Sequence, residues 1–331
     1  MGHRTGLRVT LSALVTLMVV AGLTLPGGVQ GGTFPEKGRA ITLINAYPPG
    51  GGSDVTHRML AAILEKELGI PVQVVNKVGA GGQVGYTELA RSRPDGYTIG
   101  GLNLPTVITT YLDPSRQAVF SRKSFEFLAM QDIDAGIIAV KADSPYKTLK
   151  DLLDAAKANP GKIRTTTAGI LSDDHIAAMT TERVAGVKLA IVHFDGAAPG
   201  RTAVVGGHVE AYYGNVTDIQ PVATSGQLRI LAVMDPQRSK FFPEVKTAEE
   251  QVYKIYSGVH RGVAMPAGAP KEVRDVLSEV LRKSITSDEY RTRMEKLWCL
   301  PLYMDPPTYG KFWTDYEVQA KQWVEWNAEQ K

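Results

Sequence analysis

Strand-like segments that end in glycine-rich turns and lead into helices constrain the fold of this chain more than any other feature. The apolar run Ala40 to Ala46 ends in the turn Tyr47 to Asp54, after which apolar residues recur at helical spacing. A second strand, Val72 to Val75, enters another glycine-rich loop, Asn76 to Gly85, before a short helix and the strand Tyr97 to Gly100. Strands that alternate with helices predict a mostly parallel sheet with helices on both faces.

The second half of the chain repeats this pattern. A helix is predicted to begin at the N-cap Thr148, and the strand Lys162 to Thr167 then runs into the turn Ala168 to Asp174 and a further helix. The strand Leu189 to Phe194 ends in a similar turn, Asp195 to Pro199. Two α/β units of the same design are therefore expected, which fits a length of 331 residues.

The boundaries between the two units follow from strand-like segments that could cross from one to the other. The best candidates are Ile137 to Lys141 and Val259 to Met265. We therefore predict that residues 33–140 and 260–331 form lobe 1 and that residues 141–259 form lobe 2.

The first 32 residues have the layout of a secretory signal peptide. Arg4 and Arg8 form a basic start, the apolar run Val9 to Leu25 follows, and the small residues near Gly31 provide a cleavage site. An uncleaved membrane anchor is the alternative, but this run of about 17 residues is short against the roughly 20 that a spanning helix needs. We predict that residues 1–32 are cleaved.

Cysteine usage favours the bacterial periplasm as the location. The only cysteine, Cys299, lies far from the signal segment, so a lipid-modified cysteine at the mature N-terminus and an internal disulfide are both excluded. An export signal combined with a single cysteine is typical of a periplasmic protein rather than of a small disulfide-stapled domain. We expect Cys299 to be a buried apolar residue.

Charge and motif content exclude several classes of function. Removal of the signal segment leaves 35 basic and 34 acidic side chains with no basic stripe, so a nucleic-acid partner is not expected. The glycine clusters do not complete a dinucleotide fingerprint, and no phosphate-binding Gly-Lys-Ser/Thr or Gly-x-Ser-x-Gly sequence occurs. The six histidines have no metal-ligand spacing. We expect no cofactor and no metal.

The glycine-rich turns predict an anion site. Ligands of open parallel sheets bind beyond the carboxyl ends of the strands, where the first turn of each helix carries unpaired N–H groups and a partial positive charge. Glycine lets the backbone approach a ligand closely. Several such turns facing one gap could hold an anion without lysine or arginine. Asp54 is either a helix-cap acid or a ligand contact.

A set of motifs in the same order covers nearly the whole mature chain. The first group is Pro48 to Asp54, Leu68 to Val72, Asn76, Gly79 to Gly82, Gly85 and Asp95 to Thr98. The later group is Leu149 to Leu153, His175, Phe194-x-Gly196, Gly207-x-Val209, Gly226 to Val233, Arg238, Pro243 and Pro266 to Lys271. Together they resemble the solute receptors of tripartite tricarboxylate transporters, often called the Bug family.

This resemblance implies a periplasmic solute-binding protein of the Venus-flytrap type, with two lobes that close over a small carboxylate-type solute. It also implies delivery of that solute to the membrane permease subunits of a tripartite tricarboxylate transporter, without catalysis. Nothing calls for an oligomer, so a monomer is expected. The ligand-binding residues carried over by the resemblance are Tyr47, Pro48, Gly51, Gly52, Ser53, Asp54, Gly81, Gly82, Gln83, Thr167, Gly169, Ser172, Phe194, Asp195, Gly196 and Asn215.

Four places depart from the family pattern, and all bear on the distal end of the ligand. Leu171 stands where a second glycine is usual, Asp195 where lysine is frequent, and Gly214 where aspartate is frequent, while His260-Arg261 stands near a usual tryptophan. Two hypotheses follow: Asp195 accepts a hydroxyl or amino hydrogen of the solute, and Arg261 pairs with a second carboxylate.

Two other functions stay open at the level of sequence. One is a cleft enzyme acting on a carboxylate, for which Ser172 with His175 is the only candidate pair of nucleophile and base. The other is a sensory adaptor that reports its ligand to a membrane kinase, which the sequence does not distinguish from a transport receptor.

Overall fold

The computed structural model describes residues 1–2 and 34–329. The predicted signal peptide therefore lies outside the described residues, apart from Met1 and Gly2. Residues 33–331 form one unit by their internal contacts.

The chain begins this unit with three strands, each followed by a helix. These elements are β1 (Ile41–Asn45), α1 (Gly52–Leu68), β2 (Val72–Asn76), α2 (Gln83–Arg91), β3 (Thr98–Leu104) and α3 (Thr106–Leu112). The middle of the chain contains β4 (Phe125–Lys141), α4 (Leu149–Ala158), β5 (Arg164–Thr167), α5 (Asp173–Ala185), β6 (Ala190–His193), α6 (Ala197–Val205), β7 (Ala211–Asn215), α7 (Val216–Thr224) and β8 (Leu228–Val233).

The last part consists of β9 (Gly258–Pro266), α8 (Lys271–Ile285), α9 (Asp288–Lys296), β10 (Leu300–Met304) and α10 (Pro306–Ala328). Short 3-10 turns lie at Ala80–Gly82, Pro114–Arg116, Arg122–Ser124 and Glu249–Gln251.

Two groups of three parallel strands share the same order. In the first group, β1 lies between β2 and β3, and in the second, β5 lies between β6 and β7. In both groups the first strand in the chain is central, the second lies at the outer edge and the third faces the middle of the sheet. The carboxyl ends of these strands lead into the helix starts, which is where ligands of such sheets bind.

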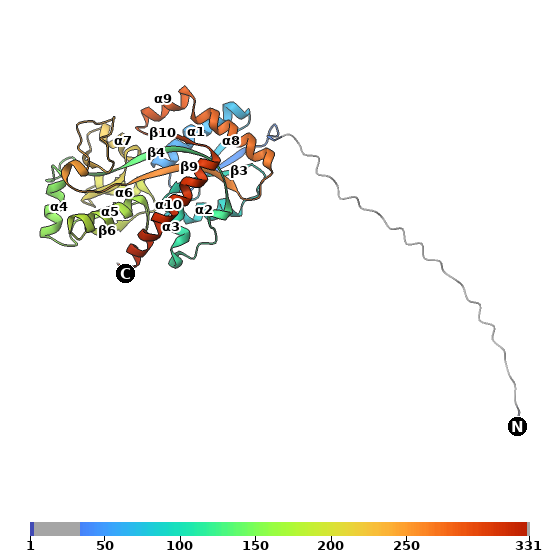
Figure 1. Ribbon diagram of the computed structural model, residues 1–331, viewed down its shortest axis with the longest axis horizontal. Helices are drawn as coiled ribbons and strands as arrows, with labels where there is room; N and C mark the ends of the chain where they lie inside the picture. The colour runs from blue at the N-terminus through green and yellow to red at the C-terminus, as the bar shows by residue number, and fades with distance from the viewer. Residues whose placement is uncertain (3–33, 330–331) are drawn as a thin grey trace. The chain divides into compact units, whose positions relative to one another are not determined.

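The long strand β4 joins the two groups. Its N-terminal half pairs antiparallel with β9 and β10, and β9 pairs with β3. Its C-terminal half pairs antiparallel with β7 and β8. We call the part built on β1–β3, β9 and β10 lobe 1, and the part built on β5–β8 lobe 2. Figure 1 shows β4 and β9 running between the two groups of elements.

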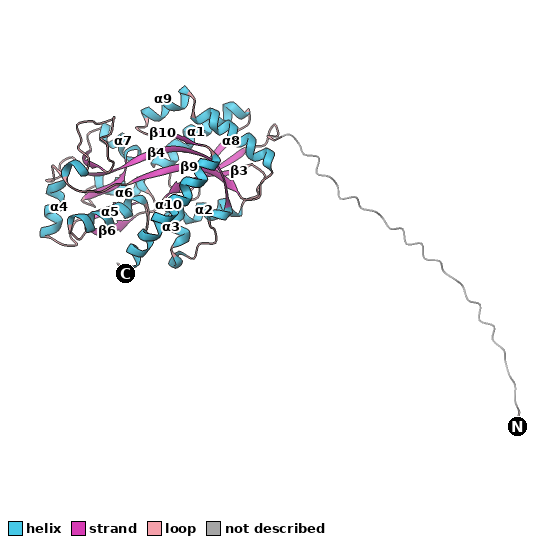
Figure 2. Cartoon of the chain, viewed as in Figure 1, coloured by secondary structure: helices cyan, strands magenta, loops and turns pink. Residues whose placement is uncertain are grey.

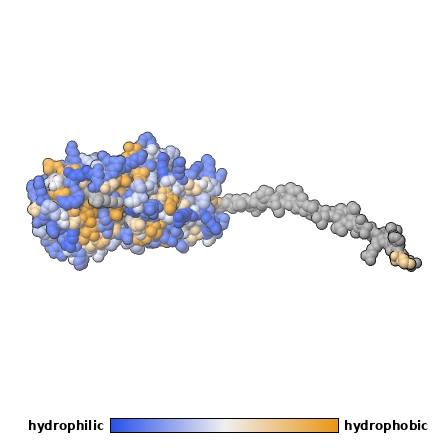
Figure 3. All heavy atoms as spheres, turned by 90° about the horizontal axis from the view of Figure 1, so that it is seen from below, coloured by the Kyte–Doolittle hydropathy of each residue, from blue (hydrophilic) through white to orange (hydrophobic). Residues whose placement is uncertain are grey.

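Helices cover the strands of each lobe, as Figure 2 shows. Four apolar clusters fill the space between helices and strands; one packs α1 and α8 against β1, and another packs α4 against the lobe 2 sheet. Hydrophilic residues predominate on the face drawn in Figure 3, with apolar residues in small groups. No helix in the described part of the chain is long and apolar enough to cross a membrane.

Helix α10 belongs to lobe 1 by its packing but reaches lobe 2. Tyr309 and Trp313 are fully buried in the apolar core of lobe 1. At its other end, Arg183 of α5 forms an ion pair with Glu329 at 2.6 Å and lies over the ring of Trp326 at 4.5 Å. The two lobes are therefore connected by side-chain contacts as well as by the strands.

The predicted fold class is confirmed: the chain is an α/β protein of the two-lobed type. The predicted parallel strands are present, while the antiparallel pairs are those made by β4, β9 and β10. The N-cap at Thr148 is also present: Oγ1 of Thr148 accepts from the N–H of Asp151, and the N–H of Thr148 donates to the carboxylate of Asp151. The proposed lobe boundaries at residues 140 and 260 stay a prediction.

Gly258 provides a test of the packing where β9 meets β4. A Cβ at this position would lie 2.8 Å from the backbone oxygen of Asp134, which is fixed in the sheet. We expect Gly258→Ala to lower the free energy of unfolding by about 1–3 kcal/mol, because overpacking of this size forces the backbone to shift. Gly206→Ala is the matched control, since an added Cβ there meets mainly the side chain of His208. Equal urea midpoints for both variants would contradict this reading.

Candidate ligand-binding site between the lobes

A cavity of about 30 Å³ lies between the lobes and is lined by the starts of helices from both. Lobe 1 contributes the turn before α1 and the beginning of α3, and lobe 2 contributes the beginnings of α5, α6 and α7. The predicted site residues that line it are Tyr47, Pro48, Gly51, Gly52, Ser53, Ser172 and Asn215. Turns that are far apart in sequence thus converge on one place, as the sequence analysis requires of an anion site.

The start of α1 forms part of the cavity wall through Gly51, Gly52 and Ser53. Gly51 is the N-cap, and no side chain caps the helix. Gly52 cannot be replaced without disturbance, because a Cβ would lie 2.7 Å from Nη2 of Arg261. The N–H of Gly52 donates to Oδ1 of Asp218 from α7 at 2.5 Å. A carboxylate of the protein itself therefore binds the helix start across the cleft.

Asp54 does not line the cavity. Its carboxylate accepts hydrogen bonds from the N–H of Gly50, from Arg58 and from Asn76. Burial opposes ionisation of this carboxyl, but the bonds from Arg58 and Asn76 outweigh it and lower its pKa. These contacts occupy the carboxylate of Asp54 within lobe 1, beside the start of α1.

Loops of the two lobes touch one another beside the cavity. The N–H of Gly81 donates to Oδ1 of Asp195 at 3.3 Å. Gly169 has φ of 138°, and a Cβ on it would lie 2.9 Å from the Cα of Gly81. Gly196 has φ of 121°, and a Cβ on it would lie 2.5 Å from Cδ of Pro48. These glycines allow a backbone approach across the cleft that other residues would prevent.

Four predicted residues lie behind these loops and not on the cavity wall. Thr167 is hydrogen-bonded through Oγ1 to Nδ1 of His193 at 2.7 Å, and the N–H of Phe194 donates to the carbonyl of Thr167. Gln83 exchanges hydrogen bonds with Arg116. Gly82 lies against the rings of Tyr47 and Tyr86, which a Cβ would meet within 3.2 Å. These four residues pack against the loops of the site and do not line the cavity.

Ser172 and His175 form a helix cap and not a nucleophile–base pair. Oγ of Ser172 accepts from the N–H of His175 at 3.2 Å, and Nδ1 of His175 accepts from the N–H of Leu171 at 2.9 Å. Burial and the neighbouring His193 lower the pKa of His175 to about 3. The imidazole therefore does not point its basic nitrogen at the hydroxyl.

Arg261 lines the cavity, and the hypothesis that it pairs with a second ligand carboxylate stays a prediction. Its guanidinium, 1% exposed, donates to Asp132 at 2.9 Å and to Asp134 at 2.8 Å. Its Nε donates to Oγ of Ser53 at 3.2 Å. The two carboxylates together carry more negative charge than the single positive charge of Arg261.

The sequence analysis missed the residues that give the cavity its charge. Asp173 of α5 and Asp218 of α7 line it, together with Asn103 and Thr106 of lobe 1. Burial, and the proximity of Asp218, raise the pKa of Asp173 to about 6. Burial and Asp134 raise the pKa of Asp218, and burial and Asp173 raise that of Asp174. The signal in the sequence is an acidic residue in the first turn of α5 and of α7.

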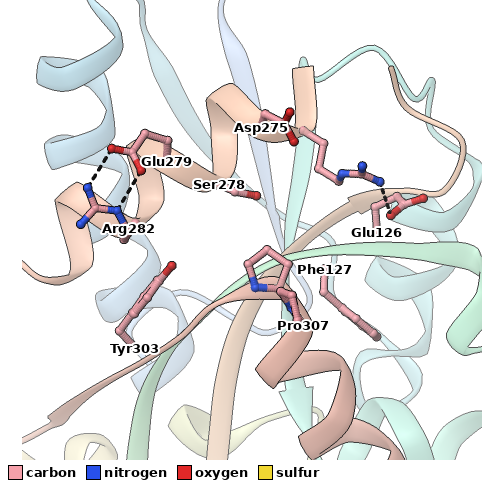
Figure 4. A pocket seen from close by; sticks show the side chains of 10 residues that line it. Glu126, Phe127, Asp275, Ser278, Glu279, Arg282, Tyr303 and Pro307 are labelled. Atoms are coloured by element: carbon pink, nitrogen blue, oxygen red, sulfur yellow. Dashed lines mark hydrogen bonds and ion pairs between the residues drawn. The ribbon is translucent and has the colours of Figure 1, made fainter. Parts of the chain in front are cut away.

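A larger groove of about 510 Å³ lies on lobe 1, between α8 and the beginning of α10 (Figure 4). Its charged side chains pair with one another: Arg282 with Glu279 at 2.8 Å, and Arg274 with Glu126 at 3.3 Å. Because these charges are already paired and no helix start of lobe 2 reaches the groove, we place the candidate site at the smaller interlobe cavity.

The fold and the interlobe position of this cavity define the class of two-lobed periplasmic binding proteins. Residues 56–327 match the family described as "Tripartite tricarboxylate transporter family receptor". The chain belongs to this family of solute-binding proteins, as the sequence resemblance predicts.

Known proteins that resemble this chain agree with that assignment. Protein BugT of Bordetella pertussis is 30% identical over 284 residues, which cover 84% of each chain. The solved periplasmic binding protein BugD is 28% identical, with a TM-score of 0.79 over 88% of this chain and 97% of BugD.

Two Rhodopseudomonas palustris proteins share the fold at lower identity. They were solved with malate and with adipate, are each 21% identical to this chain, and have TM-scores of 0.80 and 0.84. They cover 87% and 88% of this chain, and 100% and 98% of their own lengths are matched. At this identity the likeness establishes the fold alone.

Asp173 allows a test of the charge in the cavity. With a pKa of about 6 in the folded protein and the ordinary value of about 3.9 when unfolded, the folded state holds an extra proton between these pH values. The stability that this proton supplies is present below pH ~4 and is lost as the pH rises through ~6. Asp173→Asn should therefore raise the free energy of unfolding at pH 7.5 by about 1–3 kcal/mol and flatten its dependence on pH.

Chemical denaturation at pH 4.5, 6 and 7.5 measures this effect. Asp143→Asn is the control, because the side chain of Asp143 is 72% exposed and its pair with Lys141 is of the surface kind. If Asp173→Asn is less stable than the wild type at pH 7.5, the ionised carboxylate stabilises the folded protein. That result would contradict a raised pKa of Asp173 in the cavity.

Proposed function

We propose that this chain is an extracytoplasmic receptor that captures a small organic anion, a carboxylate, in the interlobe cavity and delivers it to a tripartite tricarboxylate-type membrane transporter. Membership of the receptor family supports this proposal. Two proteins of the same fold hold malate and adipate, which are both dicarboxylates. The predicted signal peptide at residues 1–32 is consistent with a periplasmic location.

The observation that carries the proposal is the start of α1. Gly51, Gly52 and Ser53 of this start line the cavity, the N-cap is a glycine without a capping side chain, and the N–H of Gly52 binds the carboxylate of Asp218. The N–H donors and the partial positive charge of a helix start both favour a bound carboxylate. Oγ of Ser53, which lines the same cavity, adds a side-chain hydroxyl.

Capture requires the lobes to separate. A cavity of about 30 Å³ has room for about one water molecule, far less than a dicarboxylate. Because Asp218 and Asp195 of lobe 2 bond to Gly52 and Gly81 of lobe 1, an incoming solute displaces these contacts. Rotation about the connecting strands is a known route for such receptors. We infer that the contacts between the loops are exchanged for contacts to the solute.

The only pair that suggested catalysis, Ser172 and His175, is bonded as a helix cap. We therefore propose binding without turnover.

Isothermal titration of the mature protein with mono-, di- and tricarboxylates and amino acids tests the proposal. We expect at least one carboxylate to bind, and at about one hundred times its dissociation constant to add about 2.7 kcal/mol to folding stability. Ser53→Ala should weaken that binding about tenfold, since it removes a hydroxyl from the anion site. Ser225→Ala, at an exposed position after α7, serves as the control. Failure of every carboxylate to bind would refute a carboxylate receptor.

A further inference from the structure

The two sides of the cavity differ in charge, and we propose that the solute is a zwitterion. Its carboxylate binds the start of α1 in lobe 1, and its protonated amino group is held by Asp173 and Asp218 of lobe 2. The inference rests on the proposed function and names the class of ligand that this particular cleft accepts.

The first line of argument is the difference between the helix starts. The start of α1 offers N–H donors, and the acid in its first turn, Asp54, is bonded to Arg58 and Asn76 away from the cavity. The starts of α5 and α7 carry Asp173 and Asp218, and both carboxyls face the cavity. The start of α1 therefore attracts an anion, while the acids at the starts of α5 and α7 attract a cation.

The cavity wall also contains a buried hydrogen-bond acceptor that has no donor in the described part of the chain. Asn103 of β3 lines the cavity and is 6% exposed, and its Nδ2 donates to Oγ of Ser53 at 2.7 Å. Its Oδ1 has no hydrogen-bond partner among the described residues. A buried acceptor left unpaired costs about 1–3 kcal/mol, so a donor from the solute would be stabilising. An ammonium group has three donors, and Asn103, Asp173 and Asp218 supply three acceptors.

The third line of argument is the balance of charge. Asp132, Asp134, Asp173 and Asp218 are all at least 94% buried. The guanidinium of Arg261 is paired with the first two, and that of Arg201 donates to the backbone carbonyl of Asp218 without an ion pair to its carboxylate. An organic cation is a partner that the carboxylates of Asp173 and Asp218, which line the cavity, fit. The second carboxylate of a plain dicarboxylate would instead face Asp173 and Asp218, and like charges at this distance repel.

The contact between Gly52 and Asp218 indicates how such a solute is oriented. It joins an N–H donor of lobe 1 to a carboxylate of lobe 2 at 2.5 Å. A zwitterion inserted between them gives each group a partner of the same kind as before: a carboxylate for the N–H of Gly52 and an ammonium donor for Asp218. A dicarboxylate satisfies only the first.

Matched pairs of probes separate the two classes. The pairs are L-aspartate with succinate, L-glutamate with glutarate, and 4-aminobutyrate with butyrate, each titrated into the mature protein. Butylamine, which has no carboxylate, completes the set. For at least one pair we expect the amino compound to bind ten times or more tightly than its partner, and we expect butylamine not to bind.

Two variants test the residues. Asp218→Asn and Asp173→Asn should each reduce the preference for the amino compound at least fivefold, while Asp143→Asn should leave it unchanged. Because the preference is a ratio of two affinities in one folded variant, a general loss of stability does not imitate the effect. If one variant does not fold, the ligand preference of the other variant still tests the inference.

The outcomes distinguish this inference from the proposed function. Equal or tighter binding of the plain carboxylates would overturn the inference and leave the carboxylate receptor intact, as would an unchanged preference in both folded variants. Binding of butylamine would overturn the role assigned to the start of α1. Failure of all seven probes and of the wider carboxylate panel would refute both.

Discussion

The buried guanidinium of Arg261 is the interaction on which the rest of the molecule depends. It lies on β9, binds Asp132 and Asp134 of β4, and reaches Ser53 at the start of α1. One side chain thus fixes the two long strands to each other and to the first wall of the cleft. Removal of one member of such a buried network leaves uncompensated charge and typically costs about 3–5 kcal/mol. The first wall of the binding site is therefore positioned by the same residues that hold the strands together.

Most of the fold could be predicted from sequence, because the parallel strands are short apolar runs bounded by glycine turns. The strand and helix limits around Ile41–Asn45 and Leu149–Ala158 were close to those expected. The 17-residue strand β4 was only partly found, since Gln131, Asp132 and Asp134 interrupt its apolar pattern. These polar residues are buried because Arg261, distant in sequence, provides a partner for the two carboxylates, and no local pattern reveals such a pairing.

For the site, the backbone was easier to predict than the side chains. Glycine turns such as Pro48 to Ser53 identify where helix starts gather, and seven of the predicted residues line the cavity. Asp173 and Asp218 were not proposed, because an acid in the first turn of a helix is common as a cap. Whether such an acid faces its own helix or a gap depends on which lobe lies opposite, which is a property of the tertiary structure. Asn103 lies within a strand and carries no motif at all.

Helix α10 has a consequence for how the lobes part. It is anchored by Trp313 in lobe 1, yet its far end holds Arg183 of α5 in lobe 2 through Glu329 and Trp326. Together with the connections through β4 and β9, this contact is a third attachment between the lobes. A third attachment restricts the directions in which the lobes can move apart. When the lobes open, the contacts of Arg183 with Glu329 and Trp326 either break or are kept while the receptor bends. Which of the two happens determines how far the lobes can open.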